Sequence, residues 1–260
     1  MRFIFFIFCT FICSVGHAND SCEVSLNYGV VVTDDQIRVL GEGGRTVYQI
    51  NKSTQLFVQG NWIDLEPEQE KSLEELSTGI HQVVPKVILL ASEGVELAID
   101  TIKQVYGGLV KDDKSQKKLQ KSLERVQMSV KEKFIRSNDT FYMGPGKLEQ
   151  VNDLVDRELE EQIEEAISTS VGGILSAISG LVANDQVTEE KMENIARRLE
   201  NMSEELGQNV GPKAETLKLK AKWFCHKFKE LDKLENDLRG SIWALQEYDV
   251  LTTGSDNNVN

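Results

Sequence analysis

The spacing of hydrophobic residues changes once along this chain, near residue 65, and this change constrains the fold more than any other feature. Over residues 19–65, short runs rich in β-branched and aromatic residues are separated by turn clusters, such as "GEGG" at 41–44 and "NKS" at 51–53. Consecutive strands joined by short turns pair with each other in antiparallel fashion. We therefore predict an antiparallel meander of four or five strands in residues 19–65.

Residues 66–251 follow a different pattern, in which apolar side chains recur every three or four positions, as on one face of an α-helix. Pro85 should break or kink the first helix. The longest helical pattern covers residues 148–183. We predict about six helices, with Phe141 and Tyr142 in an extra strand or an anchored loop between two of them.

A small antiparallel sheet has one apolar face to bury, and the helices that follow can cover it. The expected fold class is therefore α+β, with the meander packed on an elongated helical bundle. Both parts are expected to form one domain. Residues 252–260 are polar, and we expect a disordered tail there.

The first 18 residues have the order of a secretory signal peptide. Arg2 precedes an uncharged, mostly apolar run from Phe3 to Val15, and Gly16 and Ala18 supply the small residues of a cleavage site. This run is shorter than the ~20 residues that cross a bilayer. We expect residues 1–18 to be removed on export, with an uncleaved anchor as the alternative.

Acidic residues outnumber basic ones, and the formal net charge of the chain is −13. Such a charge repels nucleic acids, so a nucleic-acid partner is not expected. Residues 111–136 carry a net charge of +5 and residues 147–165 one of −6, so we expect these helical segments to pack antiparallel. A second interpretation is that the acidic face of Glu158, Glu161 and Glu165 binds a divalent cation or a basic partner, although such charged runs are usually solvated.

Two cysteines, Cys22 and Cys225, remain after removal of the signal peptide. Exported proteins usually pair an even number of cysteines. A disulfide here would close a loop of about 200 residues and, on the chain-entropy model, contribute about 5 kcal/mol. It would tie the amino-terminal segment to the last helix, and two free thiols are the alternative.

Residues suited to catalysis or metal binding are scarce. His226 follows Cys225 directly, but adjacent residues on a helix do not face each other, so the pair is poorly placed to act as nucleophile and base. His81 is the only other histidine after residue 18, and neither a zinc-binding spacing nor a Gly-x-Ser-x-Gly turn occurs. We therefore expect neither a cofactor nor a catalytic residue.

The segment from residue 166 to residue 184 has no charged side chain. Its glycines would allow another helix to approach closely. Its hydroxyl-bearing side chains and the acidic half that precedes it argue against a membrane span, so we expect a buried central helix. Its apolar face is also the candidate site for an apolar ligand and comprises Gly172, Gly173, Ile174, Leu175, Ile178 and Gly180.

Four stretches carry a family resemblance by their order along the chain: "CEVSLNY" at 22–28, "PKVILLASEGVELA" at 85–98, "SVGGILSAI" at 170–178 and "CHKFKELDKLENDL" at 225–238. In this order they resemble the YggN-like family of uncharacterised exported proteins of Gram-negative bacteria. The resemblance covers essentially the whole chain after the signal peptide. It implies a periplasmic location, reinforces the pairing of Cys22 with Cys225, and implies no activity.

Long acidic amphipathic helices without a convergent polar site form surfaces rather than pockets. We therefore expect a non-enzymatic interaction or scaffold protein of the cell envelope, whose partner is another envelope protein. The alternatives are a carrier of an apolar ligand or of unfolded exported chains, and an enzyme. The sequence identifies neither the partner nor the oligomeric state.

Overall fold

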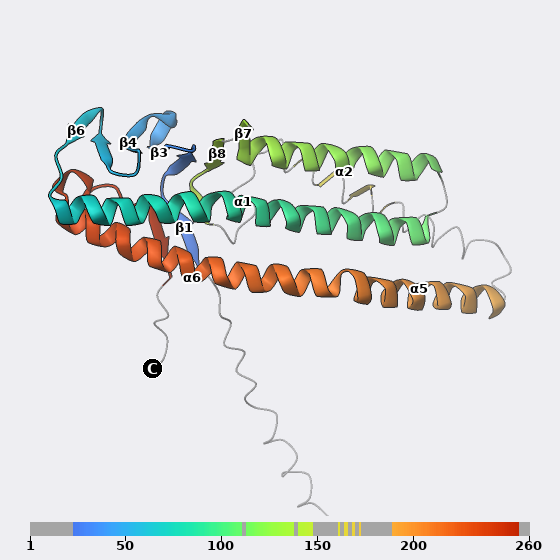
Figure 1. The fold of residues 1–260 in the computed structure, drawn as a ribbon. Helices are drawn as coiled ribbons and strands as arrows, with labels where there is room; N and C mark the ends of the chain where they lie inside the picture. The colour runs from blue at the N-terminus through green and yellow to red at the C-terminus, as the bar shows by residue number, and fades with distance from the viewer. Residues whose placement is uncertain are drawn as a thin grey trace, which may run out of the picture.

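The computed structural model describes residues 23–110, 113–137, 140–147 and 189–254, together with Glu161, Glu164, Glu165, Ser168, Thr169 and Gly172. The described part is elongated, because long helices lie side by side and the strands gather toward one end of them (Figure 1). It is α+β, with an amino-terminal antiparallel sheet followed by helices, as predicted.

Seven antiparallel strands form the larger sheet, in the order β6-β5-β4-β3-β2-β8-β7. Strands β2 to β6 follow one another in sequence and confirm the predicted meander. The sheet is larger than predicted because β8 pairs with β2, which places Phe141 and Tyr142 in a strand. The strand bounds are β2 Gly29–Val32, β3 Gln36–Leu40, β4 Thr46–Asn51, β5 Gln55–Val58, β6 Asn61–Ile63, β7 Ile135–Ser137 and β8 Thr140–Met143.

Three short strands form a second sheet, in the order β10-β1-β9. They are β1 (Val24–Leu26), β9 (Gly146–Lys147) and β10 (Leu251–Thr253). Val24 lies opposite Thr253, so the two ends of the described chain are neighbours. This pairing corrects the prediction that the disordered tail begins at residue 252, because Thr252 and Thr253 complete an edge of this sheet. The rest of the predicted tail, from residue 255, lies outside the described residues.

Helix α1 (Pro67–Leu109) is continuous over 43 residues with Pro85 inside it, so of the two outcomes predicted there, a break or a kink, the break does not occur. A proline inside a helix removes one hydrogen bond and costs about 3 kcal/mol. Val83, Val84 and Ile88 are buried in the core on either side of it. Burial of each such side chain contributes about 1.5–3 kcal/mol, so packing outweighs the missing bond.

The other described helices are α2 (Asp113–Phe134), α5 (Glu189–Asn209) and α6 (Gly211–Ser241). Only Val210 separates α5 from α6, and Pro212 stands in the first turn of α6. The described part holds fewer helices than the six predicted, because two predicted helices are merged in α1. The predicted helix over residues 148–183 lies almost entirely outside the described residues.

The main core lies between the sheets and helices α1 and α6, which run side by side (Figure 1). The two helices approach closely at Gly79, where an added Cβ atom would lie 2.5 Å from Cδ2 of Leu231. Fully buried side chains come from both layers, including Ile37, Ile50, Leu56, Leu73 and Leu238. A second cluster joins α1 to α2 through Ile99, Tyr106, Val110, Leu119, Leu123, Val126 and Val130.

Candidate functional site

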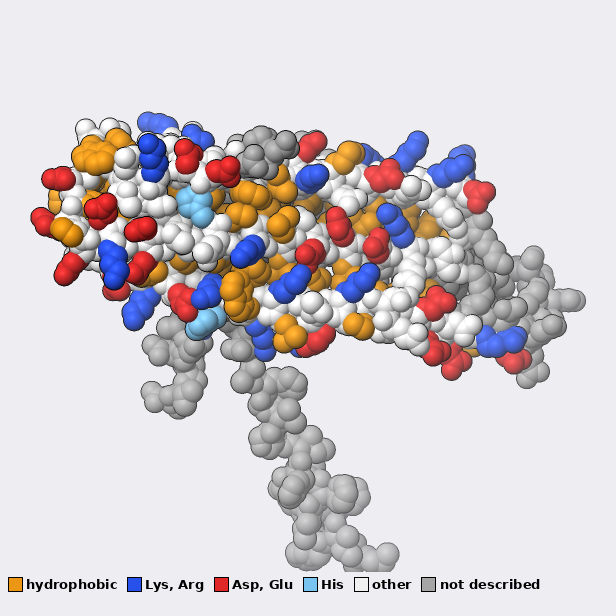
Figure 2. Space-filling model, in the orientation of Figure 1, with side chains coloured by type: hydrophobic (Ala, Val, Ile, Leu, Met, Phe, Trp, Pro, Cys, Tyr) orange, Lys and Arg blue, Asp and Glu red, His pale blue; other side chains and the backbone are white. Residues whose placement is uncertain are grey.

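Helices α1 and α6 form an open groove along their line of contact, which we call the α1–α6 groove. Its first part is a hollow of about 310 Å³, lined by Lys86, Leu89, Leu90, Glu93, Lys220, Trp223 and Phe224. Its second part, of about 380 Å³, shares Glu93 and is lined further by Glu96, Leu97, Asp100, Pro212, Lys213, Thr216 and Leu217. Figure 2 shows hydrophobic side chains along the line between these helices, with charged side chains on both sides.

Large apolar side chains are exposed in and beside the first part of the groove. Leu89 is 49% exposed and Trp223 is 48% exposed, although both line the same hollow. Leu219, one turn before Trp223 on α6, is 61% exposed. The Trp223 ring contacts Phe224 edge to face, with centroids 4.9 Å apart, which holds the indole in a defined orientation. Clustered apolar exposure of this kind marks interaction surfaces.

The local sequence explains why these side chains point outward. Residues 87–90 are four consecutive apolar residues, and a helix can direct only part of such a run toward one core. Ile88 is 2% exposed in the core, so Leu89, turned by about 100°, faces outward. The same holds for Trp223, because its neighbour Phe224 is the buried member of that pair.

The two parts of the groove differ in their charged side chains. Lys220 Nζ lies 2.7 Å from Glu93 Oε2, so one ion pair links α6 to α1 where the two hollows meet. Both side chains are about half exposed, and such a pair contributes at most about 1 kcal/mol to stability. Beyond it, Glu96 and Asp100 line the second part together with Lys213, so the acids there exceed the bases by one, whereas Lys86 lies in the apolar first part.

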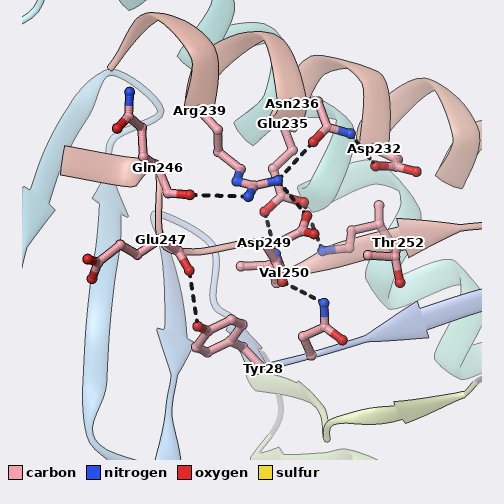
Figure 3. Close-up of polar contacts among 12 residues, drawn as sticks. Tyr28, Asp232, Glu235, Asn236, Arg239, Gln246, Glu247, Asp249, Val250 and Thr252 are labelled. Atoms are coloured by element: carbon pink, nitrogen blue, oxygen red, sulfur yellow. Dashed lines mark hydrogen bonds and ion pairs between the residues drawn. The ribbon is translucent and has the colours of Figure 1, made fainter. Parts of the chain in front are cut away.

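Helix α6 also holds the carboxyl-terminal segment, residues 242–254, through two carboxylates, of which Glu235 is buried and Asp232 is partly buried (Figure 3). Glu235 is 5% exposed, and its two oxygens accept the backbone N–H groups of Val250 at 2.7 Å and Leu251 at 2.8 Å. One turn earlier, Asp232 accepts the backbone N–H of Thr253 at 2.9 Å. These bonds satisfy backbone donors at the edge where β10 begins.

Burial dominates the electrostatics of this carboxylate cluster. It raises the pKa of Glu235 to about 7, although the two backbone N–H donors act in the opposite direction. Asp249 raises the pKa of Glu235 further, and Arg239, which lies 2.7 Å from Asp249, lowers it. Burial, followed by the charge of Glu235, raises the pKa of Tyr48 well above its usual value. The cluster therefore holds the chain end in place, and its geometry is structural.

The two histidines in the described part of the chain, His81 and His226, each contact a neighbour on their own helix. His226 Nε2 lies 3.1 Å from Glu230 Oε1, and its side chain is 70% exposed. The hydrogen bond from Lys227 is the main reason that the pKa of Glu230 is lowered. His81 Nδ1 lies 2.8 Å from the backbone carbonyl of Ser77, which fixes the ring within α1. Among the described residues, no group of three acidic, histidine or cysteine side chains is arranged to hold a metal ion.

The predicted acidic face is described only in part, since Glu158 lies outside the described residues. Glu161 and Glu165 are helical and exposed. Glu165 Oε2 lies 3.1 Å from a guanidinium nitrogen of Arg125 on α2. This contact is one example of the expected attraction between the basic and acidic segments.

The predicted apolar helix can be followed at one position only. Gly172 is helical and exposed, and a Cβ atom added there would meet nothing within 4 Å. Gly173, Ile174, Leu175, Ile178 and Gly180 lie outside the described residues, so the ligand site predicted on them stays a prediction. No helix in the described ranges has an apolar stretch sufficient to traverse a bilayer.

Cys225 lies on α6, half-buried, two residues after Trp223, and is disulfide-bonded. Cys22 lies outside the described residues. The Glu23 carbonyl accepts the N–H of Gly254 at 2.8 Å, and Asp232 of α6 holds the adjacent Thr253. The chain therefore enters β1 beside α6, where a bond from Cys22 to Cys225 is expected, and that pairing stays a prediction.

The amino-acid sequence led us to predict neither the α1–α6 groove nor the burial of Glu235. A signal for Glu235 was present, because this acidic residue continues the helical spacing of Phe228, Leu231 and Leu238, all of which are buried. A carboxylate on an apolar stripe indicates a buried group that needs donors. The groove had a weaker signal, namely adjacent large apolar residues that one stripe cannot bury together.

A model of a known protein family matches most of the chain. Residues 22–251 match the family model described as "Protein of unknown function (DUF2884)". The chain belongs to this family. The matched range begins at Cys22 and extends into β10, so it includes both sheets and every described helix. No curated protein and no solved structure matches the chain.

Proposed function

We propose that this protein is a non-enzymatic interaction protein of the cell envelope and that it binds a partner helix in the α1–α6 groove. The observation that carries this proposal is the exposure of Leu89 and Trp223, which line one hollow between two helices. Grooves of this kind accept amphipathic helices through apolar anchors spaced three or four residues apart. Tryptophan is among the residues that contribute most to binding at such interfaces.

The charges favour a particular partner helix. Besides the Glu93–Lys220 pair, the second part of the groove has two acidic side chains, Glu96 and Asp100, and one basic side chain, Lys213, so it is weakly acidic. A partner with apolar residues on one stripe and a basic residue near one end of it complements both parts. Complementary charges of this kind set orientation and speed association more than they add affinity.

The groove is also well suited to a rigid binding role. Helices α1 and α6 are packed together at Gly79 and Leu231, and Gln69 Nε2 donates to the backbone carbonyl of Ser241 at 2.8 Å. A preformed surface loses little conformational entropy when a partner binds. We further propose that the protein is exported to the periplasm and that the bond from Cys22 to Cys225 fastens the amino terminus to α6 beside the groove.

Site-specific photo-crosslinking in the native host tests the proposal. A photoreactive residue at Leu219 or Leu89 should capture one partner in stoichiometric yield. The same residue at Met128, an exposed apolar position on α2 that is 56% exposed, should not capture it. Equal capture from all three positions, or capture from none, would overturn the assignment of the groove.

The two alternative functions, a carrier of an apolar ligand and an enzyme, would each be recognised by a different measurement. Native mass spectra with bound lipid that is lost on Trp223→Glu would favour the carrier of an apolar ligand. Turnover abolished by one carboxylate substitution would favour an enzyme. The cavity of about 40 Å³ between the sheet and the helices is far smaller than the ~300–1,000 Å³ of ordinary ligand pockets, so the core itself offers no support for the carrier.

A further inference from the structure

The outer face of the seven-stranded sheet carries a row of side chains that are aligned by the strand register and lie apart from the α1–α6 groove. Residues directly opposite each other in neighbouring strands point to the same face. The register aligns six of them across β8, β2, β3, β4, β5 and β6: Tyr142, Val31, Arg38, Gln49, Phe57 and Trp62. The alternate positions, such as Val30, Ile37 and Ile50, are buried in the core, so the row faces away from the helices.

Aromatic rings stand at both ends of this row. Trp62 is 54% exposed, and its ring meets Phe57 edge to face with centroids 5.1 Å apart. At the other end, the Tyr142 ring lies against Gly29, where an added Cβ atom would be 3.4 Å from a ring carbon. Val31, between Tyr142 and Arg38 in the row, is only 4% exposed, so the row is not open there. Its partly or fully exposed stretch runs from Arg38 to Trp62 over four strands, which at about 4.8 Å between strands is about 14 Å. This stretch is long enough for a short run of rings of a linear polymer.

Polar groups occupy the middle of the row and its flank. Arg38 and Gln49 lie opposite each other, and Nε of Arg38 is buried without a hydrogen-bond partner in the described part of the chain. Two residues along the same strands, the amides of Gln36, Asn51 and Gln55 form a parallel row. Gln36 Nε2 donates to Asn51 Oδ1 at 2.8 Å, so these amides are held in line.

The charge of this face differs from that of the whole molecule. Strands β2 to β6 and β8 contain neither Asp nor Glu, although the chain has a net charge of −13. Their outward side chains are aromatic rings, amides, apolar groups and one guanidinium. A surface of that composition suits an uncharged polymer with flat rings and many hydrogen-bonding groups. A nucleic acid offers rings as well, but its phosphates would meet the negative field of the protein.

We propose that this sheet face binds a chain of N-acetylhexosamine rings. The C–H faces of sugar rings pack against aromatic rings, which Trp62 and Phe57 supply. Each acetamido group offers one N–H donor and one carbonyl acceptor, and the side chains of Gln and Asn present the matching pair. The guanidinium of Arg38 donates to sugar hydroxyls. In the OB-fold, another small β fold, a sheet face and its adjoining loops bind oligosaccharides.

Trp62 is one of three tryptophans, so the double change Trp223→Phe and Trp243→Phe leaves it as the single indole reporter. The full chain with these two changes is titrated with the hexamer of N-acetylglucosamine. We expect a saturable change in Trp62 emission, with a dissociation constant at or below the millimolar range. The hexamer of glucose, which lacks acetamido groups, should bind at least tenfold more weakly.

Calorimetry on the otherwise unchanged chain locates the site. Phe57→Ala and Gln49→Ala should each weaken binding at least tenfold, and Gln49→Ala serves if the partly buried Phe57 proves necessary for folding. Trp243→Ala removes a tryptophan that is 79% exposed elsewhere and should leave binding unchanged. Absence of saturable binding, equal affinity for the two hexamers, or an equal effect of Gln49→Ala and Trp243→Ala would overturn the proposal.

Discussion

The carboxylate of Glu235 accepts the backbone N–H of Val250 at 2.7 Å. Its second oxygen accepts the next donor, and β10 then pairs with β1 at the amino-terminal end of the described chain. One buried side chain of the last helix therefore fixes a strand that joins both ends of the fold. This arrangement gives helix α6 two roles, since one of its faces holds the chain end and another lines the α1–α6 groove.

Glu235 should make the stability of the protein depend on pH. Burial raises its pKa from an ordinary 4.5 to about 7, so the folded protein binds an extra proton between these pH values. The corresponding stability is fully present below pH 4.5 and is lost as the pH rises through about 7, by about 3 kcal/mol. Glu235→Gln should remove this dependence. Unfolding free energies of both proteins at pH 5 and pH 8 check it, and parallel pH dependences would contradict it.

Two glycines of α1 provide a matched pair for testing helix packing. Gly79→Ala places a Cβ atom 2.5 Å from Cδ2 of Leu231, so we expect a loss of about 1–3 kcal/mol as α1 and α6 separate slightly. Gly94→Ala meets nothing within 4 Å and should stabilise the helix by about 0.5–1 kcal/mol. Urea unfolding of both variants measures the two effects. Changes of the same sign would argue against the described contact of α1 with α6.

Pro85 should carry a measurable cost within α1. Pro85→Ala restores a backbone N–H that can donate to the carbonyl of His81, four residues earlier in the helix. We expect the free energy of unfolding to rise by about 1–3 kcal/mol, since the surrounding core is unchanged. Thermal unfolding measures this gain. A lower melting temperature would show that the proline ring makes a packing contribution larger than the lost hydrogen bond.

The pairing of Cys22 with Cys225 predicts equal effects of two distant substitutions. Cys22→Ser and Cys225→Ser should lower the melting temperature of the exported protein by the same amount, and the double variant should add little. Removal of such a bond costs about 2–5 kcal/mol. Denatured, unreduced protein should contain no reactive thiol. Two reactive thiols per chain, or clearly unequal single variants, would exclude this pairing.

The meander and the helical part could be predicted because the spacing of apolar residues that marks strands and helices is visible within short stretches of sequence. Alternating residues such as Ile37 and Val39 face the core of the sheet, and the turns after them join neighbouring strands. Pro85 shows where this reasoning fails, since burial of Val83 and Ile88 in the core outweighs a local helix breaker. Propensity does not include that long-range contribution.

Contacts between distant parts of the sequence could not be predicted. The pairing of Val24 with Thr253 joins residues at opposite ends of the chain, and short polar segments such as residues 252–253 carry little strand signal. The α1–α6 groove depends on how two helices far apart in sequence meet, so the exposure of Trp223 follows only from their packing. The spacing around Glu235, in contrast, did contain a readable sign of a buried carboxylate.

The claim that the α1–α6 groove binds a partner is tested most directly by measuring the affinity of purified protein for the partner that photo-crosslinking identifies. The dissociation constant is measured for the unchanged protein, for Trp223→Glu in the groove, and for Trp243→Glu at a more exposed tryptophan outside it. We predict that Trp223→Glu weakens binding by at least a hundredfold, about 2.7 kcal/mol, whereas Trp243→Glu leaves it within a factor of two. Equal affinities of the two variants would contradict the assignment of the α1–α6 groove as the binding site.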